Sequence, residues 1–192
     1  MFITDIIKAV KLMKKNVGSR PLLYPLPLVI VGAANGSKPT WTLIAHVGIM
    51  GLSRVVISSS EDHFINKVIR EKNKLSINSV TRKMLPDADV TGILTGKEDD
   101  KSFLFEYSLG DHGLPLITAS PVVMECTVEN IYKTPGFDNF ICTVDAAYAE
   151  TDYIGADGVV DFSKVDPILF EFPGYNYISM GKVLGKGKTF AK

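Results

Sequence analysis

The sequence predicts a mostly β protein (α+β) in which an antiparallel barrel or sandwich carries helical insertions. About seven segments have the composition and alternation of strands, whereas three or four have helical spacing. The strand-like segments cluster along the chain instead of alternating regularly with helices, which argues against a doubly wound parallel sheet. The length of 192 residues and the hydrophobic content of 46% fit one domain with a sizeable core.

The expected strands follow one another with short turns between most of them. We expect them at residues 24–34, 39–50, 54–60, 74–80, 121–132, 140–150 and 166–172. In "PTWTLIAHVGIM" the alternation is clear, with Thr42, Ile44 and His46 on one face and Leu43 and Ala45 on the other. The segment "KTPGFDN" between the fifth and sixth strands predicts a hairpin connection.

The clearest helix is expected over residues 62–73, where Phe64, Ile65, Val68 and Ile69 recur at helical spacing. Residues 80–112 are interpreted as helices and loops. Residues 1–20 are expected to form a short amphipathic helix ahead of a single domain over residues 21–192.

Charge and hydropathy exclude several classes of protein. Lys plus Arg and Asp plus Glu number 21 each, so nothing indicates a nucleic-acid or anionic membrane partner. Four lysines interrupt the apolar residues of the N-terminal segment, which is therefore not interpreted as a signal peptide. No apolar run reaches the ~20 residues of a membrane span, so a soluble, cytoplasmic protein is expected.

The sequence contains few residue patterns typical of a catalytic or metal-binding site. Cys126 and Cys142 fall in strand-like runs and are interpreted as buried structural thiols in a reducing compartment. His46, His63 and His112 have no metal-ligand spacing, so no metal is expected. No phosphate-binding glycine loop and no nucleophile–base pair stands out, so no catalytic side chain is predicted. Such a chain is typical of an enzyme that carries little chemistry of its own, or of one that uses a cofactor.

The segment "SSSEDHF" admits two interpretations. Ser58 and Ser59 stand three residues before Glu61 and Asp62, which is the spacing of a capping box at a helix N-terminus. Serine hydroxyls and free N–H groups at a helix N-terminus also suit a phosphate. Composition alone favours the cap, because the two carboxylates would repel a phosphate.

Several segments, taken in order, resemble the flavin reductase-like family of FMN-binding split β-barrels, which includes flavoredoxins. The matching segments are "KPTWTLIAHVGIM", "VVISSSEDHFINKVIREKNKLSINSV", "TGKEDDKSF", "VVMECTVENI" and "DYIGADGVVDFSKVDPILFEFPGYNYISMGKVLG". Together they cover about residues 20–187, nearly the whole chain. The resemblance implies an antiparallel split β-barrel with helical insertions that binds FMN.

The resemblance also implies which residues hold the cofactor. Ser58, Ser59 and Ser60 would cap the helix and donate to the FMN phosphate, with His63 or Asn66 nearby. The segment Thr42, Leu43, Ile44, Ala45 and His46 would flank the flavin along its strand. Asn78, Ser79 and Val80 would contact the ring or ribityl chain, and Lys101 would approach from a loop. The alternatives are that Asn78 satisfies a turn and that Lys101 is a solvated helix start.

The sequence departs from the family pattern at three places. Ile65 stands where the family usually has Thr, "GFDNF" lacks the family's Gly-x-His, and the proline that usually follows Asn78 is absent. The missing hydroxyl at Ile65 shifts the expected phosphate contacts onto the three serines.

The implied activity is that of an oxidoreductase in which FMN passes electrons from reduced nicotinamide or a redox partner to flavin or another acceptor. The alternatives are an FMN-binding electron carrier without catalysis and a β-barrel without flavin, such as an oligonucleotide-binding module. Family members are usually homodimers, and the apolar segment Gly48–Leu52 is expected to belong to that contact.

Overall fold

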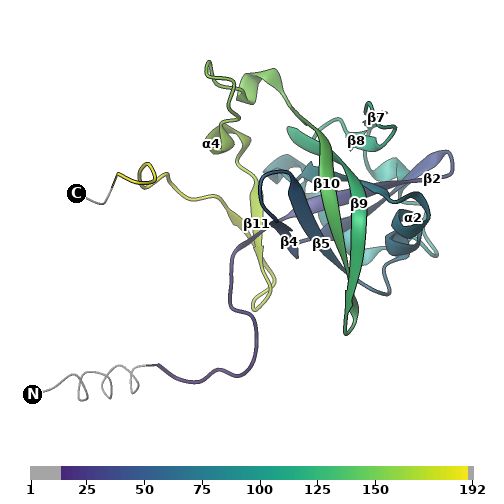
Figure 1. The fold of residues 1–192 in the computed structure, drawn as a ribbon, viewed down its shortest axis with the longest axis horizontal. Coiled ribbons are helices and arrows are strands. Elements are labelled where there is room, and N and C mark those ends of the chain that lie inside the picture. Colours follow the sequence, from purple (N-terminus) through teal and green to yellow (C-terminus); the bar gives the residue numbers. More distant parts are fainter. Residues whose placement is uncertain (1–13, 190–192) are drawn as a thin grey trace, which may run out of the picture.

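The computed structural model describes residues 14–189, and its centre is one curled antiparallel sheet (Figure 1). Seven strands form it in the order β3-β2-β6-β9-β10-β5-β4, which confirms the predicted β-barrel class. The strands are β2 (Val29–Asn35), β3 (Lys38–Ile44), β4 (Val47–Ile49), β5 (Arg54–Ser60), β6 (Lys74–Ser79), β9 (Val122–Thr134) and β10 (Phe137–Ala149). Most of the helix expected over residues 1–20 lies outside the described residues, and residues 14–20 are not helical.

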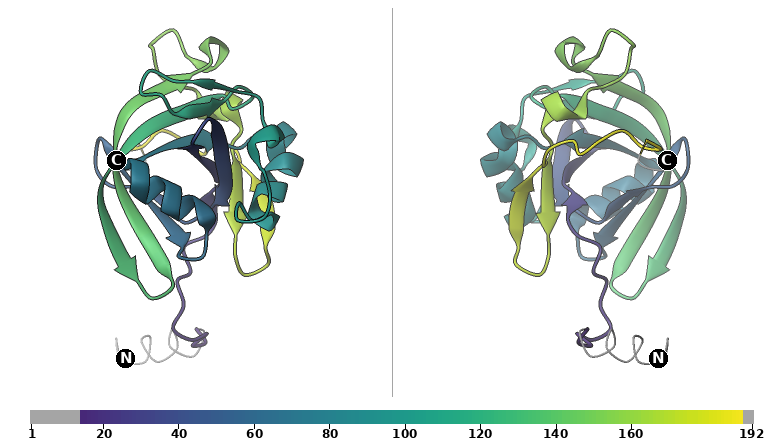
Figure 2. Two further views of the ribbon diagram at one scale, coloured as in Figure 1. Left: turned by 90° about the vertical axis from the view of Figure 1, so that its right-hand side faces the viewer. Right: turned by 90° about the vertical axis from the view of Figure 1, so that its left-hand side faces the viewer.

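The chain turns a corner where one long strand was expected. The prediction of a single strand over residues 39–50 is wrong, because β3 ends at Ile44 and β4 begins at Val47. β3 pairs with β2 and β4 pairs with β5, so the two strands lie at opposite edges of the sheet. The short connection Ala45–His46 therefore brings the two edges together and curls the sheet into a barrel (Figure 2). The amide of Ser58 on β5 donates to the carbonyl of His46 at 2.8 Å, which joins the edges at this corner.

The predicted hairpin is confirmed and is the longest in the fold. β9 and β10 have 13 residues each and are joined by Pro135 and Gly136, whose φ of 78° suits glycine. Two shifts of register interrupt the ladder between them.

Two small sheets and several helices flank the barrel. β1 (Leu26–Pro27), β11 (Ile168–Glu171) and β12 (Asn176–Ser179) form one sheet, and β7 (Tyr107–Leu109) and β8 (Pro115–Ile117) form the other. The helices are α2 (Phe64–Lys72), α3 (Leu85–Ile93) and α4 (Phe162–Val165), with short 3-10 turns at Arg82–Met84, Ser102–Leu104 and Thr151–Tyr153. The short strands β7, β8 and β12 were not predicted, since each has only three or four residues.

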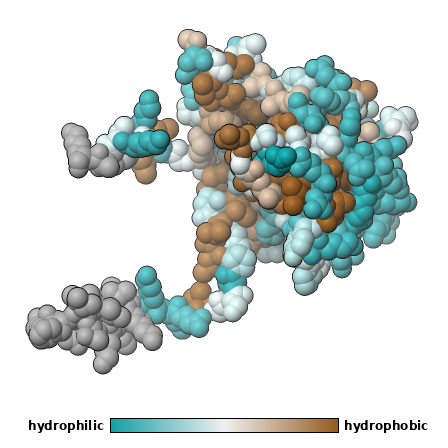
Figure 3. All heavy atoms as spheres, viewed as in Figure 1, coloured by the Kyte–Doolittle hydropathy of each residue, from teal (hydrophilic) through white to brown (hydrophobic). Residues whose placement is uncertain are grey.

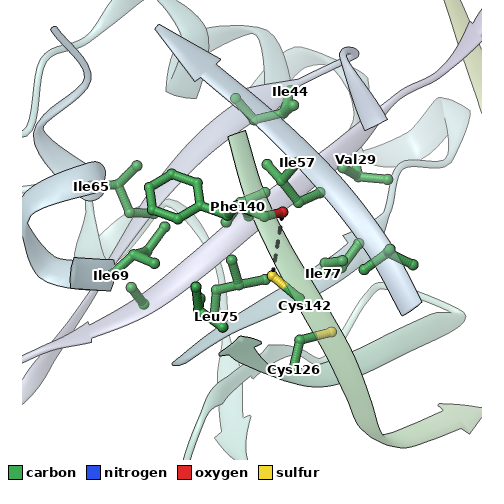
Figure 4. Close-up of a cluster of buried hydrophobic side chains, with 14 of the residues drawn as sticks. Val29, Ile44, Ile57, Ile65, Ile69, Leu75, Ile77, Cys126, Phe140 and Cys142 are labelled. Carbon is green, nitrogen blue, oxygen red and sulfur yellow. Dashed lines mark hydrogen bonds between the residues drawn. The ribbon is translucent and has the colours of Figure 1, made fainter. Parts of the chain in front are cut away.

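Two hydrophobic clusters lie on opposite faces of β2 and β3. One fills the barrel, where Ile65 and Ile69 of α2 pack against Leu75, Phe140 and other strand residues (Figure 4). Cys126 and Cys142 belong to this cluster and are both fully buried and free, as predicted. Burial raises the pKa of both thiols, which keeps them protonated and unreactive at neutral pH.

The second cluster lies outside the barrel wall. Ile30 of β2 and Trp41 of β3 pack there against α3, β8 and β11. Trp41 is fully buried, and its indole lies edge-on to Phe105. This cluster fixes α3 and the loop after it against β3, which is the arrangement that builds the candidate site.

Candidate functional site

A cavity of about 170 Å³ lies between β3, the start of α2 and the end of α3. We call it the polar cavity. Among the residues that line it are Thr40, Thr42, His63, Thr91, Gly96 and Lys101. Thr42, His63 and Lys101 were predicted from different parts of the sequence, and the fold brings these three together.

Lys101 supplies a buried cation to the polar cavity. Only 6% of this residue is exposed, and its Nζ donates to the carbonyls of Thr91 at 3.0 Å and Leu94 at 2.9 Å. An ammonium group has three donor hydrogens, so among the described residues these contacts leave one for a ligand. Burial lowers the pKa of Lys101, and Asp99 partly offsets that shift. Lys101 does begin a short helix, as the N-cap residue of the 3-10 turn Ser102–Leu104, but the prediction that it is solvated is wrong.

The N-terminus of α2 also lines the cavity. The predicted serine cap is wrong, because Ser58–Ser60 lie within β5 and the N-cap residue is His63, which makes no side-chain capping bond. Within residues 14–189, the amides of Phe64 and Ile65 have no hydrogen-bond acceptor. Free amides at the positive end of a helix favour an anion. The Ile65 side chain points into the barrel core (Figure 4), so this position offers only its backbone to the cavity.

Glycine keeps the cavity open on the side of the loop after α3. A Cβ atom at Gly96 would lie 2.7 Å from Cδ1 of Phe64 and 3.2 Å from Oγ1 of Thr40. The first distance is below any normal contact between carbon atoms, so a side chain here would displace the first residue of α2. The lining therefore combines a buried cation, free amides and threonine hydroxyls, which is a donor set that suits a phosphate group, with one carboxylate, Asp62, at its edge.

His63 stands at the edge of this donor set. Its Nδ1 lies 3.1 Å from Oγ of Ser59. Burial is the main cause that lowers the pKa of His63, the Lys101 charge lowers it further, and Asp62 partly offsets both. An anion in the cavity would oppose the effect of Lys101 and favour the protonated imidazole.

The stability of the protein should therefore depend on pH in a definite direction. Burial also lowers the pKa of His46, so the unfolded chain binds more protons than the folded chain at pH values between the lowered pKa and the usual histidine pKa. The free energy of unfolding should fall as the pH is lowered from 7.5 to 5.5, and urea titrations across this range measure it. The fall should be shallower in His63→Gln. An equally steep fall in the double variant His46→Gln/His63→Gln would contradict this explanation.

His46 and Ser58 line a different, more apolar hollow of about 260 Å³. The imidazole of His46 stacks on Phe172 with ring centres 4.3 Å apart, and Phe137 approaches its edge at 5.6 Å. Thr42 and His46 are four residues apart, so at most about 14 Å of chain separates the polar cavity from this hollow. A ligand with an anionic end and a flat ring could follow this path along β3.

The three predicted serines do not act together. Successive side chains of a strand point to opposite faces, so Ser59 points away from Ser58 and Ser60. Ser58 donates to Oδ1 of Asn139 at 2.5 Å, whereas Ser59 is buried and donates to Oδ1 of Asn66 at 2.7 Å. Ser59 and Asn66 therefore lie on the side of His63 that faces away from the polar cavity, and they do not line it.

The remaining predicted residues lie deeper in the fold or elsewhere. Asn78 is fully buried, donates to the carbonyl of Ile30 and accepts from the amide of Ile117, so it ties β6 to β2 and β8. Val80 belongs to the outer cluster. Ser79 lines an apolar groove at the other end of the barrel. The structure does not bring these three to the polar cavity.

Residues 43–45 contribute side chains to the two clusters. Ile44 packs inside the barrel, and Leu43 and Ala45 pack outside it. Along this segment the backbone is therefore the part of the chain that a ligand can approach.

Other residues of the site were not predicted. Thr40, Thr91 and Gly96 line the cavity, and Arg70 and Asp138 lie behind Asn66. Arg70 and Asn66 are four residues apart on α2, a spacing that places both on one helical face. Their partner Asp138 lies in "GFDNF", which gives no sign of this contact because it is 68 residues away from Arg70.

Other kinds of site are not apparent. No cluster of three or more potential metal ligands occurs within residues 14–189. None of the helices in that range is long and apolar enough to cross a membrane.

Comparison with known proteins identifies the family. Residues 21–177 match the family model of the flavin reductase like domain. No curated protein matches the sequence. Flavoredoxin from Methanosarcina acetivorans is 26% identical with a TM-score of 0.88, over 93% of this chain and 97% of that one. Flavoredoxin of Desulfovibrio vulgaris (Miyazaki F) is 27% identical with a TM-score of 0.86, over 94% of this chain and 100% of that one.

A more distant structure shares the fold alone. An FMN-binding protein from Thermus thermophilus is 17% identical with a TM-score of 0.76, over 91% of this chain and 100% of that one. The family model covers most of the chain, the structural similarity extends over nearly all of it, and the sheet has the predicted split-barrel arrangement. The chain belongs to the flavin reductase-like family.

Proposed function

We propose that the protein binds FMN, with the phosphate in the polar cavity and the flavin directed along β3 toward His46. The observation that carries this proposal is Lys101, a buried cation with a donor left over in a cavity that also holds free helix amides. A buried charge is costly unless a partner compensates it, and a phosphate is such a partner. The family and the FMN-binding protein of the same fold support the choice of cofactor.

The residues present fit FMN both at the polar cavity and at the hollow beside His46. Lys101, Thr42 and the first amides of α2 would hold the phosphate, and the open space beside Gly96 would admit it. At the other end, the stack of His46 on Phe172 offers a flat aromatic wall that excludes water from a ring. FMN supplies hydride and electron transfer when it is bound.

We propose further that the protein is an oxidoreductase that uses reduced nicotinamide or a redox partner as electron donor and flavin or another acceptor. The family supports this role. The second candidate is an FMN-binding electron carrier, which the similarity to two flavoredoxins over nearly the whole chain favours. We propose the cytoplasm as the location, because the buried free thiols fit a reducing compartment.

A steady-state assay separates the two candidates. The FMN-loaded protein is mixed with NADH or NADPH and excess free FMN or FAD, and the absorbance of the nicotinamide is followed. Sustained turnover above the rate without protein supports the enzyme. Absence of turnover with full FMN occupancy contradicts the enzyme and leaves the carrier.

The apolar groove at the barrel end opposite α2 is proposed as the contact with a second copy of the chain. The groove holds about 510 Å³, and Ile49, Leu52, Met124 and Leu169 are among its lining residues. Apolar side chains gather around β4 and β11 in the space-filling view (Figure 3), and Ile49 and Leu52 are 85% and 108% exposed. Homodimer interfaces are richer in apolar side chains than the rest of a protein surface. Both residues belong to the segment Gly48–Leu52 that the sequence predicts for this contact.

The substitution Leu52→Asp should therefore convert a dimer into a monomer. A carboxylate in the middle of an apolar contact loses its hydration without gaining a partner. Light scattering coupled to gel filtration measures the mass, and Leu184→Asp is the control because Leu184 is also highly exposed but does not line the groove. A wild-type protein that is monomeric at tens of micromolar would contradict the proposal.

A further inference from the structure

A buried chain of hydrogen bonds runs from Arg70 to His63 behind the polar cavity. The carboxylate of Asp138, whose side chain is 1% exposed, pairs with the Arg70 guanidinium and accepts from Nδ2 of Asn66 at 3.0 Å. Oδ1 of Asn66 accepts from Oγ of Ser59 at 2.7 Å, and Oγ of Ser59 lies 3.1 Å from Nδ1 of His63. We call these residues the relay: Arg70, Asp138, Asn66, Ser59 and His63.

Each bond of the relay has only one direction. A guanidinium only donates and a carboxylate only accepts, and Nδ2 of Asn66 donates both to Asp138 and to the carbonyl of Ser60 at 2.9 Å. This fixes the amide of Asn66, so its Oδ1 faces Ser59 and takes the one hydroxyl hydrogen. Ser59 is then left with lone pairs toward His63, and Nδ1 of His63 must carry the hydrogen between them.

This direction decides what His63 offers a ligand. A neutral imidazole with its hydrogen on Nδ1 has a lone pair on Nε2, and Nε2 makes no hydrogen bond to the residues that the structure describes. Such a nitrogen accepts hydrogen bonds and repels the oxygens of a phosphate. His63 can bind a phosphate only after Nε2 has taken up a proton, because the relay holds the other hydrogen in place.

We propose that His63 takes up a proton from solution when the FMN phosphate enters the polar cavity, and that Ser59, Asn66 and Asp138 are positioning residues that enforce this coupling. The inference rests on the proposed function. It gives the site a dependence on pH that a lysine alone would not provide, since Lys101 is protonated before the ligand binds.

The charges around His63 are compatible with this coupling. Lys101 on the loop after α3 opposes a second cation in the empty cavity, whereas the neighbouring Asp62 favours it. Behind Asn66, Arg70 and Asp138 compensate each other, and Lys133 of β9 lies 3.8 Å from Oδ1 of Asp138. The phosphate is thus the group whose binding adds negative charge beside His63 and favours the protonated imidazole.

Calorimetry in two buffers measures the coupling directly. FMN is titrated into the apoprotein at pH 7.5 in Tris and in HEPES, whose ionisation enthalpies differ, and the difference in binding heat gives the protons taken up. At this pH the second phosphate ionisation, with a pKa of about 6, is largely complete, so the ligand itself needs no proton. We expect an uptake of up to about one proton per FMN. Riboflavin, which lacks the phosphate, should bind without uptake.

Two variants test the relay. In His63→Gln, FMN should bind more weakly and without proton uptake. In Ser59→Ala, the imidazole loses the acceptor that holds its Nδ1 hydrogen, so the neutral ring can place its hydrogen on Nε2 and donate to the phosphate. FMN binding should then persist in Ser59→Ala while the proton uptake falls toward zero.

Ser60→Ala is the matched control, because Ser60 lies next to Ser59 but its hydroxyl takes no part in the relay. It should keep the wild-type uptake. Uptake that persists in His63→Gln, or FMN binding by the wild type with no uptake, would overturn the inference and leave the proposed function intact. Unchanged uptake in Ser59→Ala would overturn the role of the relay. Failure of the wild type to bind FMN would overturn the proposed function and this inference with it.

Discussion

The substitution Lys101→Met is expected to weaken FMN binding by about 10- to 100-fold, because a hydrogen bond to a charged group contributes about 1.5–3 kcal/mol and each 1.4 kcal/mol is tenfold in affinity. Methionine keeps much of the length and apolar stem of lysine but removes the buried cation that lines the polar cavity. The quenching of flavin fluorescence on binding measures the affinity.

Two comparisons separate the loss of a phosphate contact from damage to the fold. Riboflavin affinity should change little in Lys101→Met, because riboflavin has no phosphate for Lys101 to bind. Lys97→Met removes the same charge from the same loop, but Lys97 is exposed and does not line the cavity, so FMN affinity should stay within about twofold of wild type. Equal losses for FMN and riboflavin in Lys101→Met would show that the phosphate does not lie beside Lys101.

The substitution Glu125→Ala should lower the free energy of unfolding by about 3–5 kcal/mol, because it leaves two backbone amides without an acceptor, each at a cost of about 1–3 kcal/mol. Glu125 is fully buried on β9, and its carboxylate accepts from the amides of His112 and Leu114 and from the hydroxyl of Tyr148 at 2.9–3.2 Å. Burial, together with the bonds to Glu125 and Asp111, raises the pKa of Tyr148 to about 12, so the phenol remains a donor. Alanine would leave the amides of His112 and Leu114 without their acceptor, whereas the Tyr148 hydroxyl would keep its bond to Asp111.

The loop before β8 depends on the same carboxylate. A Cβ atom at Gly110 would lie 2.5 Å from the Glu125 carboxyl group, so the chain packs directly on it. A fall in the melting temperature of about 10 °C is expected at 2–4 °C per kcal/mol for a chain of this size. Glu129→Ala on the same strand is the control, because Glu129 forms a solvent-exposed pair with Arg54, and such pairs contribute little to stability. Equal destabilisation by the two substitutions would contradict the role assigned to Glu125.

The sequence predicted the parts of the fold that local pattern determines. The strands at β5 and β6 and the β9–β10 hairpin lie close to where alternation and turn residues placed them. The corner at Ala45–His46 was missed because the alternation of apolar and polar residues continues through it, so the pattern does not reveal that the chain changes edges. Of the pair β11–β12 only β11 was predicted, since β12 has four residues and none of them is fully buried.

The candidate site was predicted only in part, because local sequence pattern does not show which strands become neighbours. The resemblance pointed to Thr42, His63 and Lys101, which the fold gathers around one cavity. It also placed all three serines at the phosphate, whereas strand alternation turns Ser59 into the barrel toward Asn66 and leaves Ser58 outside. Asp138 was missed because its contact with Arg70 depends on the pairing of β5 with β10, and no local pattern encodes which strands become neighbours.

A single reconstitution tests whether this chain holds FMN. The purified protein is mixed with excess FMN, desalted, and its absorption spectrum is recorded beside that of Lys101→Met. We expect the wild type to retain flavin absorption at close to one FMN per chain and the variant to retain much less. A folded wild-type protein that leaves the column without flavin absorption would show that the chain does not hold FMN.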